Sequence, residues 1–188
     1  MIRSFIGVEI ADGVRKAIAD DLRALKAVAP RVKWVKPDNF HLTLKFLGDV
    51  RENDLKELFD ALDAALGGRG GFVIGMKGVF ALPNRRCPRV VAVGVDDGAD
   101  EMIALNSLVE ETCARLGYPV EKRPYRPHIT LGRVKLPDDA QGLPEAVGML
   151  GDSSYGFSDV DEAVVFMSEL RRSGPVHSSM LHIGLSRL

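Results

Sequence analysis

The sequence predicts an α+β fold of two similar lobes, with antiparallel sheets that face a central cleft and an approximate two-fold symmetry. Three observations predict it: helical and strand periodicities mix along the chain, the two halves share a motif, and the composition is that of a globular protein. The 188 residues suit one domain. We expect this domain to span 1–188, as lobes at about 1–97 and 98–188 with chain ends that cross over.

The first half contains segments of both periodicities, bounded by glycine and proline. Apolar residues recur at helical spacing in 12–28 and 52–68, and Pro30 ends the first of these helices. The expected elements in chain order are a strand at 3–10, a helix at 12–28, a short extended piece at 32–35, a strand at 40–48, a helix at 52–68, and strands at 71–83 and 89–95.

The second half repeats much of this plan. Its helix near 138–149 is weaker than the others because Gly142 and Pro144 interrupt it. The expected elements in chain order are a helix at 99–116, a strand at 127–134, the weaker helix, and strands at 162–170 and 175–185.

One motif occurs in both halves, His-x-Thr-Leu. His41 and Thr43 carry it first, and His128 and Thr130 carry it 87 positions later. Alternation along a strand places each His and Thr on one face and the apolar residues on the other. The same alternation puts Lys45 on the face of His41 and Phe46 on the opposite face. If the lobes are symmetric, both polar pairs face one cleft.

Two imidazoles and two hydroxyls in one cleft suit attack on a phosphodiester. A neutral His accepts a proton from water while a protonated His supplies one to the leaving oxygen, and both forms exist near neutral pH. The hydroxyls donate hydrogen bonds to the nonbridging oxygens. This chemistry needs neither a pair of carboxylates nor a metal.

The repeated motif is also compatible with less specific roles. A single His-x-Thr is more often the solvent-exposed face of a strand, and duplication alone can preserve two copies. A zinc site needs a third protein ligand, and neither motif has one at a telling spacing. His177 and His182 are the other histidines, and five positions apart in a strand they face opposite sides.

The composition excludes several classes of protein. The formal net charge of −1 argues against a nucleic-acid binder that works by bulk charge, although the basic segments 84–89 and 121–126 are either solvated loops or a local basic rim. Two cysteines, Cys87 and Cys113, are too few for a disulfide framework and favour a reduced, cytoplasmic setting. We expect no membrane span and no signal peptide.

Two segments resemble a known family. WVKPDNFHLTLKFLG at 34–48 and RPHITLGR at 126–133 are similar to the two signature segments of the 2H phosphoesterase superfamily. Within it, the chain resembles the RNA 2',3'-cyclic phosphodiesterases, also called 2'-5' RNA ligases. The resemblance spans essentially the whole chain. It implies a bilobal fold and metal-independent opening of a terminal 2',3'-cyclic phosphate to a 2'-phosphate, without a cofactor.

The resemblance also implies roles for individual residues. His41 and His128 match the catalytic histidines, and Thr43 and Thr130 match the hydroxyls that hold the phosphate. The resemblance also places Arg133 and Phe5 in contact with substrate. Arg126 and Tyr125 lie just before His128, and we expect Arg126 to belong to a basic rim that guides the RNA strand and Tyr125 to stack on a base.

The alternation of faces along a strand bears on the assignment of Arg133. Arg133 lies an odd number of residues from His128, so it reaches the same face only if the strand ends or bulges there. The alternative role for Arg133 is that of an ordinary surface arginine that does not contact substrate. Phe5 matches an aromatic residue that stacks on a base, as aromatic side chains do with unpaired bases.

We therefore expect a hydrolase that opens RNA 2',3'-cyclic phosphate, with His128 as base and His41 as acid. The alternatives are an RNA-end binding module and a 2'-5' RNA ligase that use the same cleft. The expected partners are RNA 3' ends that carry the cyclic phosphate, tRNA fragments among them. We expect a monomer in the cytoplasm, with no membrane contact, no metal and no cofactor.

Overall fold

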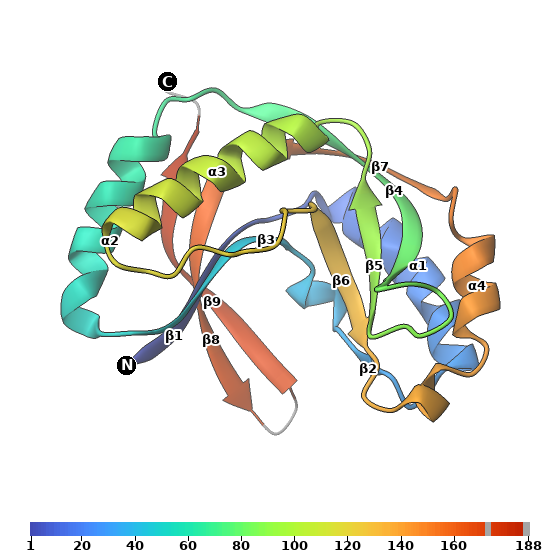
Figure 1. Cartoon of the computed structure of the whole chain (residues 1–188). Helices are drawn as coiled ribbons and strands as arrows, with labels where there is room; N and C mark the ends of the chain where they lie inside the picture. The colour runs from blue at the N-terminus through green and yellow to red at the C-terminus, as the bar shows by residue number, and fades with distance from the viewer. Residues whose placement is uncertain (172–173, 186–188) are drawn as a thin grey trace.

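The computed structural model describes residues 1–171 and 174–185, which form an α+β fold with nine strands and four α-helices (Figure 1). The elements in chain order are β1 (Ile2–Val8), α1 (Asp12–Val28), β2 (Lys33–Trp34), the 3₁₀ turn η1 (Pro37–Asn39), β3 (Leu42–Val50), α2 (Glu52–Leu66), β4 (Phe72–Leu82), β5 (Val90–Val95), α3 (Ala99–Arg115), β6 (His128–Arg133), the 3₁₀ turn η2 (Pro137–Ala140), α4 (Leu143–Met149), β7 (Ser154–Val160), β8 (Glu162–Arg171) and β9 (Gly174–Gly184).

The strands follow the order β7-β4-β5-β6-β3-β1-β8-β9, and β2 pairs with the end of β6. At the centre, β3 and β6 share the register pair Leu42–Ile129, and from there the two sides of the sheet diverge (Figure 1). We call the side with β1, β3, β8 and β9 the β3 lobe and the side with β2, β4, β5, β6 and β7 the β6 lobe. The predicted bilobal α+β fold with antiparallel sheets is confirmed.

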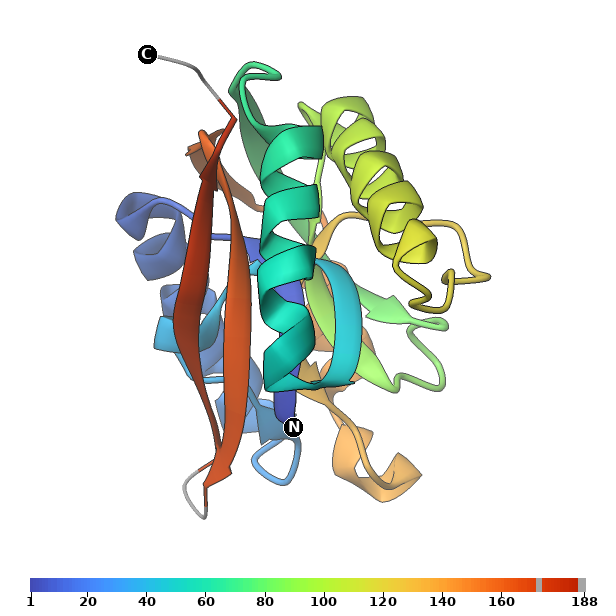
Figure 2. The same ribbon diagram turned by 90° about the vertical axis from the view of Figure 1, so that its left-hand side faces the viewer.

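Each lobe contains strands from both halves of the chain. The late strands β8 and β9 lie beside β1, and the early strands β4 and β5 lie beside β6. Helices α2 and α3 pack on the β3 lobe, and α1 and α4 pack on the β6 lobe (Figure 1). Figure 2 shows α2 between the β8–β9 hairpin and α3. The sequence places the boundary between the two lobes at about residue 97, with chain ends that cross over. This boundary stays a prediction.

The helices form because their apolar residues recur at helical spacing and bury one face. In α1 the buried residues are Val14, Ile18, Leu22 and Leu25, and in α2 they are Leu58, Leu62 and Leu66. Leu42 and Ile129, on the apolar face of the motif strands, are fully buried. Burying such residues removes apolar surface from water, which anchors both motif strands in the core.

The structure differs from the elements expected from the sequence in two places. β7 was not predicted, since Ser154, Gly156 and Ser158 weaken its periodicity; it forms by pairing with β4, and the Ser158 hydroxyl accepts a hydrogen bond from the backbone N–H of Ala11. The helix expected near 138–149 is two short helices, η2 and α4. Gly142, at φ 80°, separates them in the left-handed conformation that glycine tolerates best.

A β-bulge interrupts β3 just after its motif. Thr43 pairs with Gly7 and Lys45 pairs with Ile6, so Leu44 is the extra residue. The bulge reverses the alternation of faces beyond it. The expectation that Lys45 shares a face with His41, and that Phe46 lies opposite, is therefore wrong.

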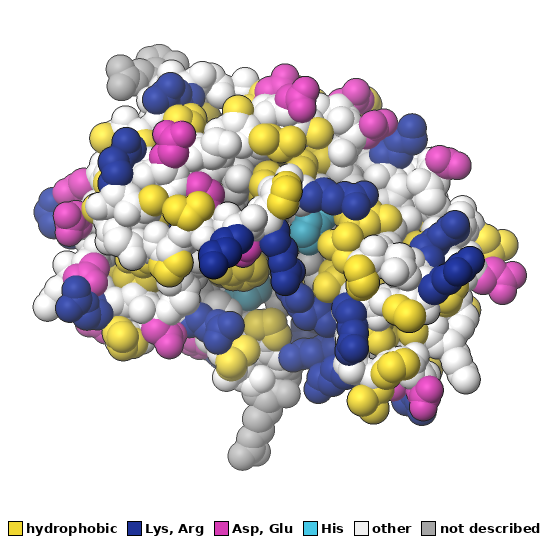
Figure 3. Space-filling view, viewed as in Figure 1, with side chains coloured by type: hydrophobic (Ala, Val, Ile, Leu, Met, Phe, Trp, Pro, Cys, Tyr) yellow, Lys and Arg dark blue, Asp and Glu magenta, His cyan; other side chains and the backbone are white. Residues whose placement is uncertain are grey.

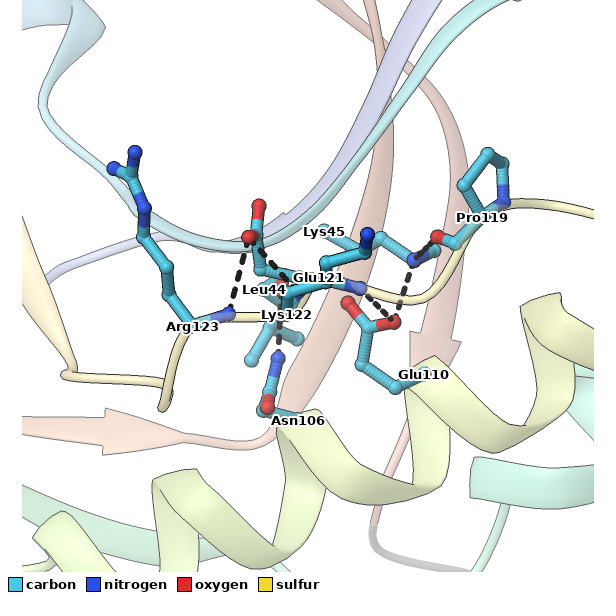
Figure 4. A network of polar contacts seen from close by, with 8 residues as sticks. All are labelled: Leu44, Lys45, Asn106, Glu110, Pro119, Glu121, Lys122 and Arg123. Carbon is cyan, nitrogen blue, oxygen red and sulfur yellow. Dashed lines mark hydrogen bonds and ion pairs between the residues drawn. The ribbon is translucent and has the colours of Figure 1, made fainter.

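The structure places both side chains on the faces opposite to those expected. Lys45 is 4% exposed and reaches α3, where its Nζ donates hydrogen bonds to Glu110 and to the carbonyl of Pro119 (Figure 4). Phe46 is 67% exposed on the cleft side, and its ring centroid lies 6.1 Å from that of Phe5.

Among the described residues, no helix has the length and apolar character that crossing a membrane requires. Cys87 is exposed and Cys113 is buried, and both are free thiols.

Candidate active site

The two motifs meet where the lobes join. Continuing the register of the Leu42–Ile129 pair by one residue each way places each motif His opposite the Thr of the other motif. Both histidines then lie on the cleft face, opposite the buried pair. Diagonal neighbours in an antiparallel pair are about 7–8 Å apart. His41 and His128 are such diagonal neighbours, and Figure 3 shows two His patches at the boundary between the lobes.

Both imidazoles are held by the same kind of hydrogen bond, to the backbone carbonyl two residues earlier in the chain. Nδ1 of His41 lies 2.8 Å from the carbonyl oxygen of Asn39, and Nδ1 of His128 lies 2.7 Å from that of Arg126. A carbonyl oxygen only accepts, so each Nδ1 carries the hydrogen. In the neutral ring, Nε2 is then an unprotonated acceptor, which is the state that a general base requires.

The environments of the two histidines differ. Nε2 of His41 accepts a hydrogen bond from the Thr43 hydroxyl at 3.0 Å. The His41 ring stacks on Phe5 with centroids 4.7 Å apart and meets His177 edge-on at 5.4 Å. His128 has a more open surrounding, in which Phe80 lies edge-on at 6.2 Å.

These surroundings lower the pKa of both imidazoles. Burial lowers the pKa of His41 from 6.5 to about 4, and the positive charges of His177, Arg15 and His128 add to this effect. Burial is also the main cause that lowers the pKa of His128, followed by the nearby cations Arg126 and Arg133. In the unliganded protein, both histidines are therefore mainly neutral at neutral pH.

Arg133 reaches the face of His128 because β6 also bulges. Thr130 pairs with Ala92 and Gly132 with Val91, so Leu131 is the extra residue. The bulge restores Arg133 to the cleft side. Without such a bulge, regular alternation would put Arg133 on the face opposite to His128. The charge of Arg133 lowers the pKa of His128, which agrees with a position on the same side.

Arg126 also lies next to the second motif. Its guanidinium carbon is 3.9 Å above the centre of the Phe80 ring, a cation–π contact that fixes the cation beside His128. Its backbone carbonyl is the one that orients the imidazole of His128.

The two aromatic candidates are less open than expected. Phe5 is 3% exposed, because His41, His177 and Phe166 cover its ring. Tyr125 packs against the core, and burial raises the pKa of its hydroxyl. The involvement of both residues with substrate stays a prediction.

The structure adds two residues to the cleft that the sequence did not single out for it. His177 comes from β9 and has a buried Nδ1 without a hydrogen-bond partner in the described part of the chain. Phe46 offers an exposed ring on the cleft side. In the sequence, only the internal repeat pointed to Phe46, because the offset of 87 positions between the two motifs aligns Phe46 with Arg133.

In the described ranges, no group of three or more His, Cys, Asp or Glu residues could hold a metal ion. His182 pairs instead with Glu162, and its Nδ1 lies 2.8 Å from the carboxylate oxygen.

Comparison with known proteins gives consistent matches over nearly the whole chain. The family model described as LigT like Phosphoesterase matches twice, over residues 8–92 and 93–177, which agrees with the internal repeat. A Methanothermobacter thermautotrophicus protein named RNA 2',3'-cyclic phosphodiesterase is 34% identical over 179 residues, which cover 95% of this chain and 96% of the relative. A protein of the same name from Aeropyrum pernix is 35% identical over 155 residues, which cover 81% of this chain and 85% of the relative. The crystal structure of E. coli LigT in apo form has a TM-score of 0.77 at 25% identity and covers 99% of this chain and 98% of that chain.

Proposed function

This chain belongs to the LigT-like phosphoesterase family, and on that premise we propose that it hydrolyses the terminal 2',3'-cyclic phosphate of RNA to a 2'-phosphate. The names of the curated relatives support phosphodiesterase chemistry on RNA ends. One observation carries the proposal: two His-x-Thr pairs share one face at the β3–β6 junction, with both imidazoles fixed through Nδ1.

The reaction requires two proton transfers at phosphorus. The oxygen of a water molecule forms a bond to phosphorus while the bond from phosphorus to O3' breaks. A neutral imidazole takes the proton of the water, and a protonated imidazole gives a proton to O3'. Both protons are accounted for, and the product is a 2'-phosphomonoester with a free 3'-hydroxyl.

We assign the base to His41 and the acid to His128, the reverse of the assignment made from sequence. The base must be neutral, and the pKa of His41 shows the larger lowering, to about 4. A bound phosphodiester anion raises the pKa of both rings, which assists protonation of the more open His128.

The remaining cleft residues hold the substrate. The hydroxyls of Thr43 and Thr130 donate to the nonbridging oxygens once substrate displaces the Thr43–His41 hydrogen bond. The cations Arg133 and Arg126 offset the charge of the phosphate. The exposed ring of Phe46 provides a surface for stacking of the terminal base.

The first experiment follows a short RNA that ends in a 2',3'-cyclic phosphate by phosphorus NMR, with purified protein and excess EDTA. Appearance of a 2'-phosphomonoester supports the proposal, and a 3'-phosphate product contradicts the assignment of O3' as leaving group. Absence of turnover in EDTA with recovery on added zinc contradicts the metal-free mechanism. If RNA binds but is not cleaved under either condition, the chain is a binding module.

Substitution of each histidine separates the two proton transfers. His41→Ala and His128→Ala should each reduce turnover of the cyclic phosphate by about a hundredfold or more. A nucleoside 4-nitrophenyl phosphodiester has a leaving group that departs without an acid. His128→Ala should therefore keep a larger fraction of activity on this ester than His41→Ala, and the opposite order would reverse our assignment.

The proposed substrates are RNA 3' ends, tRNA fragments among them, and the proposed form is a cytoplasmic monomer that uses no cofactor or metal.

A further inference from the structure

Lys33 lies directly opposite Arg133 where β2 pairs with β6. Directly opposite residues share a face with their Cβ atoms about 4.5–5.5 Å apart, and like charges in such a pair destabilise a sheet. The neighbouring pair identifies the face. The ring of Trp34 lies so close to Gly132 that a Cβ there would meet Trp34 at 2.5 Å, on the core side. Lys33 and Arg133 therefore point to the opposite side, toward the cleft.

β2 holds this lysine firmly in place, although the strand has only two residues. The indole nitrogen of Trp34 donates to the carbonyl of Ala29 at 2.9 Å. The backbone nitrogen of Val35 donates to the carbonyl of Leu131, the bulged residue of β6, at 2.8 Å. These contacts fix the backbone of Lys33 against the end of β6.

Within the part of the chain that the structure describes, neither Lys33 nor Arg133 forms an ion pair. The acidic turn after β6 is already engaged, because Arg31 pairs with Asp139 at 3.1 Å and donates to the carbonyl of Asp138 at 2.7 Å. The unfavourable pair suggests an anionic ligand that compensates it.

The position of Lys33 and Arg133 in the cleft indicates which anion compensates their charges. Along the cleft face of β6 come His128, Thr130 and then Arg133, with Lys33 beside it. Strand rise puts Arg133 roughly 7–10 Å beyond Thr130, a separation on the scale of one nucleoside. Figure 3 shows Lys and Arg side chains that continue in a band from the His patches along the boundary between the lobes.

We propose that Lys33, next to Arg133, binds the internucleotide phosphate on the 5' side of the terminal nucleoside. This subsite makes an RNA strand a better substrate than a nucleoside 2',3'-cyclic phosphate. The inference rests on the proposed function for the identity of the reacting end.

The test compares three substrates that share one reacting end: adenosine 2',3'-cyclic phosphate, the dinucleotide ApA with the same cyclic end, and that dinucleotide with an uncharged methylphosphonate linkage. The wild-type protein should show a several-fold higher kcat/KM for the charged dinucleotide than for the other two. Lys33→Gln should lose most of this advantage and leave the mononucleotide unchanged. The salt dependence for the dinucleotide, as a log–log slope, should become shallower by about 1.

Charge reversal gives a second, independent readout. Lys33→Glu can pair with Arg133, so its melting temperature should rise by about 1–3 °C while its preference for the dinucleotide disappears. A damaged fold would instead lower the melting temperature. Lys26→Glu is the matched control, because Lys26 is exposed on α1, a helix that packs mainly on β7 and α4, and because the substitution changes the net charge equally. It should leave the preference intact.

Three results would overturn the subsite. They are equal wild-type kcat/KM for all three substrates, no effect of Lys33→Gln, or an equal loss on mononucleotide and dinucleotide. If the wild-type protein cleaves none of them, the proposed function fails separately. Calorimetric titration with adenosine 2'-phosphate and with ApA 2'-phosphate then tests the subsite without turnover, since Lys33→Gln should weaken binding of the dinucleotide only.

Discussion

Burial sets the protonation state of His41 and therefore the pH dependence of the proposed reaction. As the pH falls through about 4, His41 gains a proton and can no longer act as base. As the pH rises through the pKa of His128, which is lowered from 6.5, the acid is lost. We expect kcat/KM to be bell-shaped with its maximum between these two values. Because bound phosphate raises both pKa values, kcat should peak at higher pH. A flat kcat/KM between pH 5 and 8 contradicts the mechanism.

The same shift affects stability. The folded pKa of His41, about 4, lies below the unfolded value of 6.5, so the unfolded chain binds more protons between these values. The contribution is fully present above pH 6.5 and is lost as the pH falls toward 4. Between pH 7 and 4.5, urea unfolding should show that the wild-type protein loses about 2–3 kcal/mol more than His41→Phe. Equal losses in the two proteins would show that burial does not depress this pKa.

His177 places an unsatisfied nitrogen against His41. Its Nδ1 is buried without a partner among the described residues, and its charge adds to the lowering of the pKa of His41. His177→Phe preserves the ring contacts and removes the unpartnered atom. We expect an unchanged or higher melting temperature and a raised pKa of His41, measured by NMR titration. A marked loss of stability would show that Nδ1 has a partner, such as a bound water.

The sequence predicts the four motif residues as the site, because repetition of His-x-Thr at matching positions in both halves is rare without a shared cause. It could not place His177. The position of that side chain depends on the pairing of β9 with β8, where His177 lies opposite Ser168. Such a contact between distant segments leaves no local pattern.

At the level of elements, alternation predicted both motif strands but not their bulges. A strand pattern assumes that each residue has one partner, whereas Leu44 and Leu131 are extra residues. Asn106 is 8% exposed on the buried face of α3, and its amide donates to the carbonyl of Leu44 at 2.8 Å (Figure 4). A buried polar side chain needs a hydrogen-bond partner, and here the partner is the carbonyl of the extra residue in the bulge.

The bulge on β3 also links the first motif to the segment before the second. Lys45 Nζ donates to Glu110 at 2.6 Å and to the carbonyl of Pro119 at 2.8 Å, and Glu110 also accepts from the backbone N–H of Glu121 (Figure 4). Lys45→Met should cost about 3 kcal/mol in urea unfolding, because Glu110 loses its partner while remaining largely buried.

The double variant Lys45→Met/Glu110→Leu supplies the control for this network. Apolar replacement of both partners should recover most of the stability. It should not restore kcat/KM, because the tether to Pro119 is lost and the segment that leads to His128 is less well positioned. Recovery of both quantities would show that the pair has no positioning effect.

On the scale of the whole molecule, strand order joins the two halves of the chain. β1 lies between β3 and β8, so β8 from the second half covers residues of the first. The internal repeat predicted two similar units. Periodicity does not specify which strands become neighbours, since pairing between distant strands depends on the complete core.

This interleaving predicts that neither half folds alone. Residues 1–97 would leave β1 without β8, which would expose Ile6 and Phe5, both nearly fully buried in the intact chain, and would leave β5 without β6. Residues 98–188 would leave β6 without β2, β3 and β5, the described strands with which it pairs. Each fragment would expose apolar surface that only the other half covers. We expect poorly dispersed NMR spectra for both fragments and one cooperative thermal transition for the intact protein, whereas a fragment that unfolds cooperatively would identify an independent domain.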